Sequence, residues 1–285
     1  MSNDLGIEYV FFDLDGCLSR GKVFDKSLQP RLDEEMPTMR EFMEFMKPIG
    51  VRRAAATGRS ITISRAIIDA LMDDLSVVEH GTILYDPISG SQQHIVDSIE
   101  LYYSFRPAKE CLERFAENAC QFDDQLSSYC AGYGVQVSHL GDNIHIYTVE
   151  FSPRLECNAL LVADFLESRL MPTELVAHIR AGRIRRMTSN EAVDYLPPVS
   201  KKDGVAAVIK IKNVDPSRVL VVGDSYSSDS PMMMDVASGG GYLICPSNSD
   251  TRLKQFVSAH GCKGYVANKP YFGGSIQGLH YFFDR

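Results

Sequence analysis

The chain has 285 residues, a formal net charge of −8, 45% hydrophobic residues and 23% charged residues. This composition is typical of a globular protein with one large domain or two smaller ones. No apolar run approaches about 18 residues, so no membrane span is expected, and an acidic chain without a basic tail argues against a nucleic-acid partner. The seven cysteines include no CxxC pair. Reduced thiols and a polar N-terminus without a signal-peptide pattern predict a cytoplasmic protein.

Short apolar runs predict buried parallel strands, because each run is continuous rather than alternating. They are Tyr9–Phe12, Val51–Ala56, Val77–Val78, Val219–Val222 and Tyr242–Cys245. Between them, apolar residues recur at helical spacing in Pro37–Met46, Ser60–Asp74 and Lys202–Ile211. Alternating strands and helices predict a doubly wound, Rossmann-like α/β domain with a parallel sheet.

The middle of the chain has a different pattern, which predicts helix, two strands, helix and further short strands. The helices are expected at Arg106–Tyr129 and Pro153–Leu170, and the strands at Val135–Leu140, Asn143–Val149, Leu175–Ile179, Arg183–Met187 and Ala192–Leu196. Gly141-Asp142 between the first two strands is a hairpin signal. We therefore expect a small antiparallel sheet with two helices on one face, inserted at residues 87–197 into a core made of residues 1–86 and 198–285. Turn-forming residues at Asp86–Ser91 and Pro197–Pro198 mark these boundaries.

The first motif with chemical content is Phe11-Phe12-Asp13-Leu14-Asp15-Gly16. It places Asp13 and Asp15 directly after a predicted strand, and ligands bind at the carboxyl ends of strands in parallel α/β sheets. Alternation along the strand gives both side chains roughly the same heading. Carboxylates this close repel each other, so the site needs a cation or a shared proton. The alternative is a turn in which Asp15-Gly16 only reverses the chain.

The second motif, Ala56-Thr57-Gly58-Arg59-Ser60, follows the next strand and begins a predicted helix. A hydroxyl group, free backbone N–H groups and a helix N-terminus together form a natural phosphate site. The simpler alternative is that Thr57 or Ser60 serves only as the N-cap of the helix.

Two further motifs lie near the end of the inserted segment. In Ser200-Lys201-Lys202, cations stand at a helix N-terminus, where they oppose the helix dipole, and this indicates an anion nearby. Solvated lysines are the alternative. Gly223-Asp224-Ser225-Tyr226-Ser227-Ser228-Asp229 then follows a predicted strand and adds two carboxylates. A polar loop with solvated acids is the alternative there.

Together these motifs, over residues 9–60 and 199–235, resemble those of the haloacid dehalogenase (HAD) superfamily of phosphohydrolases. Glu79-His80-Gly81 and Ser247-Asn248-Ser249 resemble further elements of that superfamily. The insertion lies between the second and third motifs, as in the type IIB cap of Cof-like and sucrose-phosphatase-like members.

The resemblance implies a magnesium-dependent phosphatase that acts on a small phosphorylated metabolite, with a sugar phosphate as the default substrate. It implies Asp13 as the nucleophile, Asp15 as general acid and base, and Thr57 and Lys201 as stabilisers of the transferring group. Magnesium would be held by Asp13, the Asp15 carbonyl and Asp224, while Asp229 would hold a metal-bound water or orient Lys201. The expected substrate contacts are Gly58, Arg59 and Asn248, with Arg180, Arg183 and Asn190 from the inserted segment.

Several points stay open at this stage. Arg180, Arg183, Arg185 and Arg186 are either an anion-binding cluster or a solvated edge, and Lys202 competes with Lys201 for the motif position. Cys17 replaces the usual Thr, which we expect to alter loop packing, and His80 replaces the usual Asn. A phosphomutase or phosphotransferase would use the same aspartyl-phosphate. A glycosyl transferase would leave Thr-Gly-Arg unexplained, and a non-catalytic binding protein would not need all the acids. Sequence patterns do not indicate the oligomeric state.

Overall fold

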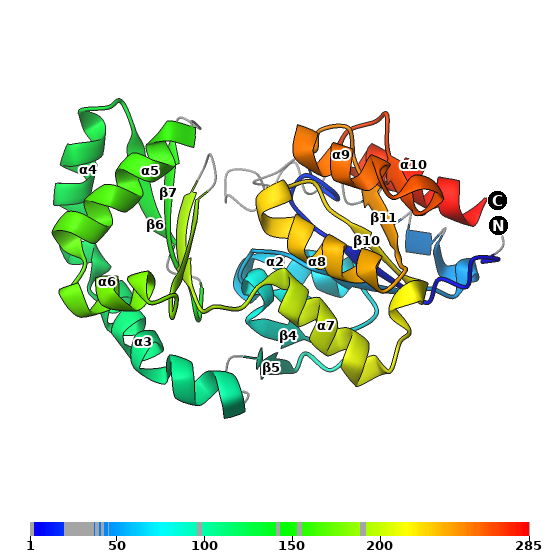
Figure 1. Ribbon diagram of the computed structural model, residues 1–285, viewed down its shortest axis with the longest axis horizontal. Coiled ribbons are helices and arrows are strands. Elements are labelled where there is room, and N and C mark those ends of the chain that lie inside the picture. Colours follow the sequence, from blue (N-terminus) through cyan, green and yellow to red (C-terminus); the bar gives the residue numbers. More distant parts are fainter. Residues whose placement is uncertain are drawn as a thin grey trace. The chain divides into compact units, whose positions relative to one another are not determined.

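The computed structural model describes residues 3–19, 37, 40, 43–44, 46–95, 99–140, 143–152, 156–188 and 192–284. The chain divides into two compact units (Figure 1). Met1–Ile95 and Ser200–Arg285 form the core unit, and Val96–Val199 form the inserted unit. Among the described residues, no helix has both the length and the apolar character needed to cross a membrane.

The core unit is built on a five-stranded parallel sheet in the order β12-β11-β10-β1-β2. Its strands are β1 (Tyr9–Phe12), β2 (Arg52–Ala55), β10 (Val219–Val222), β11 (Tyr242–Cys245) and β12 (Gly264–Val266). Three of them, β1, β10 and β11, have the predicted bounds, and all of their residues are buried. The predicted α/β class with a parallel sheet is thus confirmed.

Helices cover both faces of this sheet, because successive strand residues point to opposite sides. Val10 and Phe12 pack in the cluster that includes α2 (Ile61–Leu71) and α10 (Tyr271–Phe283). Tyr9 and Phe11 pack in the cluster of the opposite face. That cluster includes α7 (Lys201–Lys212), α8 (Tyr226–Ser238) and α9 (Thr251–Ser258). Short 3-10 turns occur at η2 (Lys47–Ile49), η7 (Pro216–Arg218) and η8 (Gly261–Lys263).

The helix expected at Pro37–Met46 lies only partly within the described residues. Pro37, Arg40, Met43, Glu44 and Met46 are helical, and the other positions fall outside the described part. Met43 and Met46 are buried in the same cluster as α2, as their spacing predicted.

A second, three-stranded sheet lies in the core unit and corrects one strand prediction. It consists of β3 (Ser76–Val78), β4 (Ile83–Tyr85) and β5 (Gln92–His94), and both strand pairs are antiparallel. Val77 keeps only a single parallel bridge, to Ala56. Asp86–Ser91, expected to lead into the inserted segment, is the hairpin turn between β4 and β5, closed by the Asp86 N–H donating to the Ser91 carbonyl at 3.0 Å. The first boundary therefore lies at residues 95/96 rather than 86/87, and the second at 199/200.

The inserted unit contains an antiparallel sheet in the order β6-β7-β9-β8. Its strands are β6 (Gln136–Leu140), β7 (Tyr147–Ser152), β8 (Arg185–Thr188) and β9 (Ala192–Leu196). The helical elements are α3 (Ile99–Glu117), η5 (Ala119–Phe122), α4 (Asp123–Ala131), α5 (Glu156–Phe165), the π-helix η6 (Leu166–Leu170) and α6 (Thr173–Arg180). Alternate strand residues Tyr147, Val149, Phe151, Val193 and Tyr195 pack with these helices in one apolar cluster. One face of the sheet is therefore covered by helices.

Two predictions for the inserted unit were wrong. The single helix expected at Arg106–Tyr129 is two helices, α3 and α4, separated near Asn118 by the turn η5. The strand expected at Leu175–Ile179 is part of α6. Leu175 and Val176 are both buried, and this fits a helix face rather than an alternating strand.

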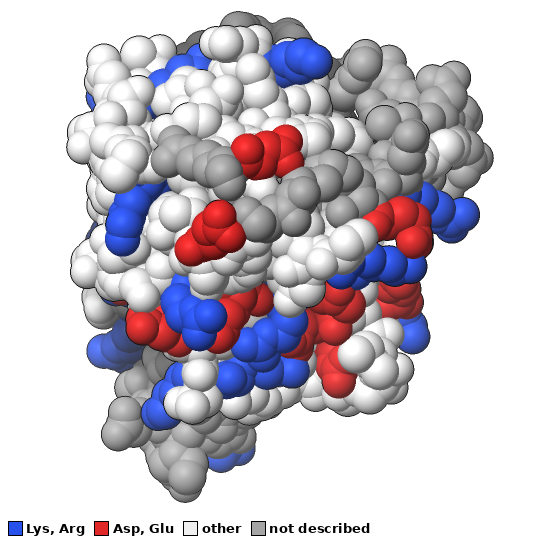
Figure 2. Space-filling model, turned by 90° about the vertical axis from the view of Figure 1, so that its right-hand side faces the viewer, with Lys and Arg blue, Asp and Glu red and all other residues white. Residues whose placement is uncertain are grey.

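Charged side chains of both signs are interspersed on the face of the molecule shown in Figure 2. At the amino ends of β1 and β2, Arg52 lies 3.7 Å from both Glu8 and Asp74. Arg218 also pairs with Glu8, and Lys212 pairs with Asp74. These basic residues are thus neutralised within the core unit.

Candidate active site

Three chemically active segments meet because their strands are neighbours in register. Phe12, the last residue of β1, is paired with Val222 of β10 on one side and with Ala55 of β2 on the other. The residues that follow these strand ends are therefore held side by side. The Asp13 N–H donates to the Val222 carbonyl at 2.9 Å, and the Ala56 N–H donates to the Phe12 carbonyl at 2.7 Å. Asp13, Thr57 and Asp224 are brought to one edge of the sheet, as the sequence predicted.

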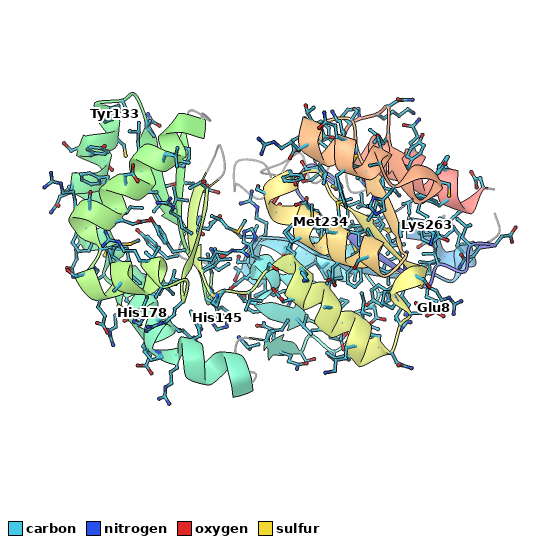
Figure 3. All side chains as sticks on the ribbon, in the orientation of Figure 1. Glu8, Tyr133, His145, His178, Met234 and Lys263 are labelled. Carbon is cyan, nitrogen blue, oxygen red and sulfur yellow. The ribbon has the colours of Figure 1, made fainter. Side chains whose placement is uncertain are left out.

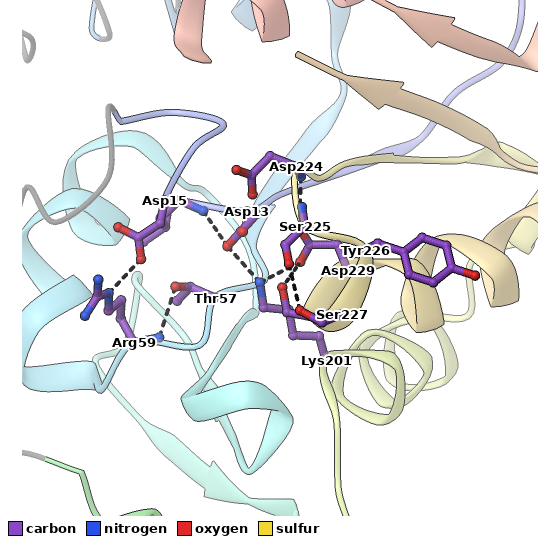
Figure 4. Close-up of polar contacts among 12 residues, drawn as sticks. Asp13, Asp15, Thr57, Arg59, Lys201, Asp224, Ser225, Tyr226, Ser227 and Asp229 are labelled. Carbon is purple, nitrogen blue, oxygen red and sulfur yellow. Dashed lines mark hydrogen bonds and ion pairs between the residues drawn. The ribbon is translucent and has the colours of Figure 1, made fainter. Parts of the chain in front are cut away.

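Lys201 is the centre of a buried charge cluster (Figure 4). Its Nζ lies 2.9 Å from Asp13 Oδ1 and 2.7 Å from Asp229 Oδ1. The Lys201 side chain is 3% exposed, whereas Lys202 is 46% exposed and pairs with Asp235 at 3.3 Å. The structure therefore places Lys201, and not Lys202, in the site. Ser200 caps α7 in a capping box with Asp203, which fixes the start of the helix that carries this lysine.

Both carboxylate oxygens of Asp229 are already used within the protein. Oδ1 accepts from Lys201, and Oδ2 accepts from the backbone N–H groups of Asp224 and Ser225, both at 2.9 Å. Asp229 is completely buried in the first turn of α8. It thus joins the lysine to the loop that carries Asp224.

The cluster holds more negative than positive charge, and the pKa values of its carboxyl and ammonium groups are shifted. Burial, and after it the charge of Asp229, raises the pKa of Asp13 to about 8. Burial, followed by Asp229 and Asp13, also raises the pKa of Asp224 well above its ordinary value. Burial alone would lower the pKa of Lys201, but Asp13 and Asp229 together raise it. The two carboxyl pKa values thus rise because burial and neighbouring carboxylates disfavour their charged forms, and the pKa of Lys201 rises because two carboxylates contact its ammonium group.

Asp15 lies beside this cluster and is held by Arg59. Arg59 Nε donates to Asp15 Oδ2 at 2.6 Å, and the Arg59 N–H donates to Thr57 Oγ1 at 3.1 Å. Asp15 Oδ1 is buried and has no hydrogen-bond partner among the described residues. Arg59, expected to contact substrate, thus pairs with Asp15 through Nε, and the other Asp15 oxygen has no partner among the described residues.

The donor set can hold a divalent cation. One ligand atom each from Asp13, Cys17 and Asp224 lies within 4.8 Å of the others. Gly16 makes this approach possible: it has φ 79°, and a Cβ there would lie 1.9 Å from Asp224 Oδ2. Three carboxylates, Asp13, Asp224 and Asp229, face one lysine, so a dication would balance the two charges left over. The residues therefore fit Mg²⁺, whose preferred ligands are oxygen atoms.

Asn248 supports the loops around the cation site. Its Nδ2 donates to the Gly16 carbonyl at 2.9 Å and lies 3.5 Å from Asp224 Oδ2, while its Oδ1 accepts from the Tyr271 N–H at 2.6 Å. The amide group expected to bind substrate is thus occupied in fixing Gly16 and α10.

The turn η3 (Glu79–Gly81) connects the second motif to α7. Glu79 and His80 both have positive φ, 48° and 53°, which is rare and costly for residues other than glycine. The His80 ring lies where a Gly58 Cβ would be, at 2.4 Å, and a Gly81 Cβ would lie 1.9 Å from the Ser200 carbonyl. Gly58 and Gly81 are therefore required by close packing, and His80 borders the loop that carries Thr57.

The basic residues expected in the inserted unit do not form one cluster. Arg180 is exposed at the end of α6, while Arg183 Nη1 lies 3.3 Å from the Nδ1 of His178, labelled in Figure 3. Arg186 is in register with Tyr195 on the helix-covered face and pairs with Glu167 at 3.0 Å. Arg185 is in register with Leu196, which places it on the opposite face. Asn190 lies outside the described residues.

The residue whose place in the site the sequence analysis underrated is Cys17. It was expected to affect loop packing, but its sulfur lies among the carboxylates. The signal was present in the sequence, because Cys17 directly follows the Asp-x-Asp-Gly motif and its thiol is a soft metal ligand.

Comparisons with known proteins show the family and the fold. The model of the family sucrose-6F-phosphate phosphohydrolase matches residues 11–283. No curated protein matches the chain. A structure from Thermoplasma acidophilum is 14% identical, with TM-score 0.63 over 97% of this chain and 98% of the other. Sucrose-phosphatase from Synechocystis, in complex with sucrose and phosphate, is 15% identical with TM-score 0.55 over 97% and 98%. A haloacid dehalogenase-like hydrolase from Bacteroides thetaiotaomicron is 13% identical, with TM-score 0.58 over 97% and 99%. These structures share the fold.

Proposed function

The chain belongs to the sucrose-6F-phosphate phosphohydrolase family of HAD phosphatases, and on that premise we propose that it is a Mg²⁺-dependent phosphatase of a sugar phosphate or similar small phosphometabolite. The observation that carries the proposal is the buried cluster in which Asp13 and Asp224 lie within ligand distance while Lys201 contacts Asp13 at 2.9 Å. A phosphate monoester is doubly charged near neutral pH. Its hydrolysis needs a nucleophile, charge shielding and a proton donor for the leaving oxygen.

Each need is met by a residue of the core unit. Asp13 attacks phosphorus with one carboxylate oxygen and forms an aspartyl-phosphate. Asp15 donates a proton to the leaving oxygen and later takes one from the attacking water. Its Oδ1, which has no hydrogen-bond partner among the described residues, supports this role, and Arg59 positions the other oxygen. Lys201 and Thr57 stabilise the charge of the transferring group, and Asp229 orients Lys201.

Magnesium would be held by the carboxylates of Asp13 and Asp224 and the backbone carbonyl of Asp15. When bound, it supplies charge neutralisation and alignment of the phosphate group. Asp229 is the less suitable ligand, because both of its oxygens accept hydrogen bonds from Lys201 and the loop.

We assign the choice of substrate to the inserted unit, acting as a cap. A sugar ester is favoured because the matching family acts on a sugar phosphate and because the Synechocystis sucrose-phosphatase was solved with sucrose and phosphate. The proposed substrate contacts are Gly58, the exposed Arg180 and Arg183, and Arg185 on the sheet face away from the helices.

The experiment is a screen of phosphorylated sugars and other small phosphate esters, with released inorganic phosphate and isomerised sugar phosphate both measured. The proposal expects phosphate release that depends on Mg²⁺. Isomerised sugar phosphate without phosphate release would instead identify a phosphomutase. Binding without turnover of any ester, under conditions where the protein is folded and Mg²⁺ is present, would identify a non-catalytic binding protein.

A further inference from the structure

Cys17 lies inside the donor set of the proposed metal site, so the inference here rests on the proposed function. Its Sγ and one oxygen each of Asp13 and Asp224 are all within 4.8 Å of one another. Two ligands of one ion are separated at most by the sum of their bonds to it, about 4.2 Å for two Mg–O bonds and about 4.5 Å for one Zn–S and one Zn–O bond. Small adjustments therefore place the sulfur within bonding distance of an ion held by the two carboxylates.

The local structure fixes the thiol in this place. Cys17 is completely buried, and its carbonyl accepts from Ser275 Oγ of α10 at 2.7 Å. The turn that carries it is closed by the N–H groups of Leu18 and Ser19, which donate to the Leu14 carbonyl at 3.0 and 2.9 Å. These contacts hold the backbone that carries the sulfur beside the site.

The purely structural alternative is that Cys17 is a small apolar side chain in the core, as most buried cysteines are. Part of its environment fits, because it belongs to the apolar cluster on the α2 side of the sheet. Apolar packing does not account for the two carboxylates near the sulfur, however. The sulfur is also completely buried, which shields it from oxidants in solution. A buried sulfur within 4.8 Å of two carboxylate oxygens thus has the surroundings of a metal ligand.

We infer that Cys17 Sγ is a ligand of this metal site and gives it affinity for thiophilic dications, of which Cd²⁺ is the clearest probe. Thiolate selects soft or borderline ions, whereas Mg²⁺ uses the oxygen atoms alone. On binding, the S–H bond breaks, the proton passes to solvent and a metal–sulfur bond forms, with no change of oxidation state. The site therefore accepts either Mg²⁺ on oxygen ligands or a soft dication on two oxygens and one sulfur.

The test is an ultraviolet titration of the metal-free, full-length chain with CdCl₂. Coordination by Cys17 predicts a thiolate-to-cadmium charge-transfer band that is lost in Cys17→Ser and kept in the matched control Cys262→Ser, whose thiol is exposed. Asp224→Asn is expected to lower the affinity for the Cd²⁺ that gives the band by about tenfold or more. A band that persists unchanged in Cys17→Ser would overturn the inference.

A second measurement needs no variant and covers the case in which Cys17→Ser does not fold. Excess Mg²⁺ added to the wild-type chain with bound Cd²⁺ is expected to reduce the band, because both ions use Asp13 and Asp224. A band indifferent to Mg²⁺ at concentrations that saturate phosphatase activity would contradict the shared site. Mg²⁺-dependent phosphate release without a Cys17 band would refute this inference and leave the proposed function standing. A Cys17 band that Mg²⁺ suppresses, in a chain without phosphatase activity, would support this inference and refute the proposed function.

Discussion

At the scale of single residues, the two adjacent lysines differ more than their sequence suggests. Lys201 is buried between Asp13 and Asp229, whereas Lys202 is half exposed and pairs with Asp235 at the surface. Breaking a buried ion pair by removing one partner leaves an uncompensated charge, while an exposed pair contributes little. Lys202 is therefore the matched control for a substitution of Lys201.

Lys201→Met is expected to lower the free energy of unfolding by about 3 kcal/mol, because Asp229 loses its only lysine partner in the cluster while staying buried. Lys202→Met is expected to change it by less than about 0.5 kcal/mol. Urea unfolding in EDTA measures both values without a contribution from bound metal. Equal stability of the two variants would mean that the cluster does not depend on the lysine charge.

Arg59 is expected to act through Asp15. Replacing it by Ala removes the partner that positions Asp15 Oδ2, so kcat should fall by about tenfold, which is part of the contribution that a positioned acid usually makes. The structure predicts little change in KM for a small ester such as p-nitrophenyl phosphate, because Arg59 Nε is committed to Asp15 at 2.6 Å. Steady-state kinetics with Arg59→Lys as the conservative variant separates the two parameters. A large rise in KM with kcat unchanged would make Arg59 a substrate contact, as the sequence analysis expected.

Removal of metal is the third prediction at this scale. Activity should be lost in EDTA and restored by Mg²⁺, since the carboxylates of Asp13 and Asp224 are raised in pKa and need a cation beside them to stay ionised. Ca²⁺ should restore far less, because it prefers more ligands and longer bonds. Full phosphatase activity in excess EDTA would rule out the metal.

At the scale of elements, the strands that carry the chemistry were predictable, and so was the helical segment at Pro153–Leu170, seen as α5 and η6, whereas the break between α3 and α4 and the helix α6 were not. Continuous apolar runs located β1 and β10 to the residue, because a strand that is buried on both faces is apolar throughout and the runs end at Asp13 and at Gly223-Asp224. In α6 the short segment Leu175–Ile179 fits both a strand and one turn of a helix, and local pattern did not decide between them.

Side-chain partners were harder to predict than elements. Arg59 and Asn248 were placed near the site correctly, but the sequence could not show that Asp15, Gly16 and Tyr271 already occupy their polar groups. Such pairings depend on contacts between residues that are distant in the chain. The same holds for the hairpin β4–β5, where turn formers that predicted a domain boundary close a hairpin within the core unit.

A substitution at Gly16 tests whether the close approach of Asp224 to the turn after β1 is needed for activity. Gly16→Ala places a Cβ on the Asp224 carboxylate and is expected to abolish Mg²⁺-dependent activity. The matched control is Gly50→Ala, which has a similar φ of 71° and no atom within 4 Å of the added carbon. Both variants should lose about 1–2 kcal/mol of stability from the positive φ, but only the first should lose activity. Comparable activity in the two variants would show that the close approach at Gly16 is dispensable.

At the scale of the whole molecule, the chain consists of two units with separate apolar cores. The residues proposed for chemistry, from Asp13 to Asp229, all belong to the core unit. If the inserted unit selects the substrate, changes within it should alter selectivity and leave the hydrolysis of a small generic ester intact.

Adjacent residues of β8 provide the comparison. Arg185 lies on the sheet face away from the helices, and Arg186 pairs with Glu167 on the helix-covered face. Arg185→Ala is expected to raise KM for the best sugar phosphate about tenfold, as loss of one charged contact does. Arg186→Ala should change KM little. Kinetics with the sugar ester and with p-nitrophenyl phosphate, measured for both variants, provide the check. An unchanged substrate profile in Arg185→Ala would move selectivity to other residues of the inserted unit.

The central claim is that Asp13 attacks phosphorus, and trapping the phosphorylated enzyme tests it most directly. The wild-type chain, mixed with Mg²⁺ and a substrate labelled in its phosphate group and then quenched in acid within milliseconds, should carry label that hydroxylamine removes, as an acyl phosphate requires. In Asp13→Asn the label should be absent and steady-state phosphate release should fall more than about 10³-fold, because an amide cannot replace the nucleophile. Phosphate release within tenfold of wild type in a folded Asp13→Asn chain, or protein-bound label that survives hydroxylamine, would contradict the account.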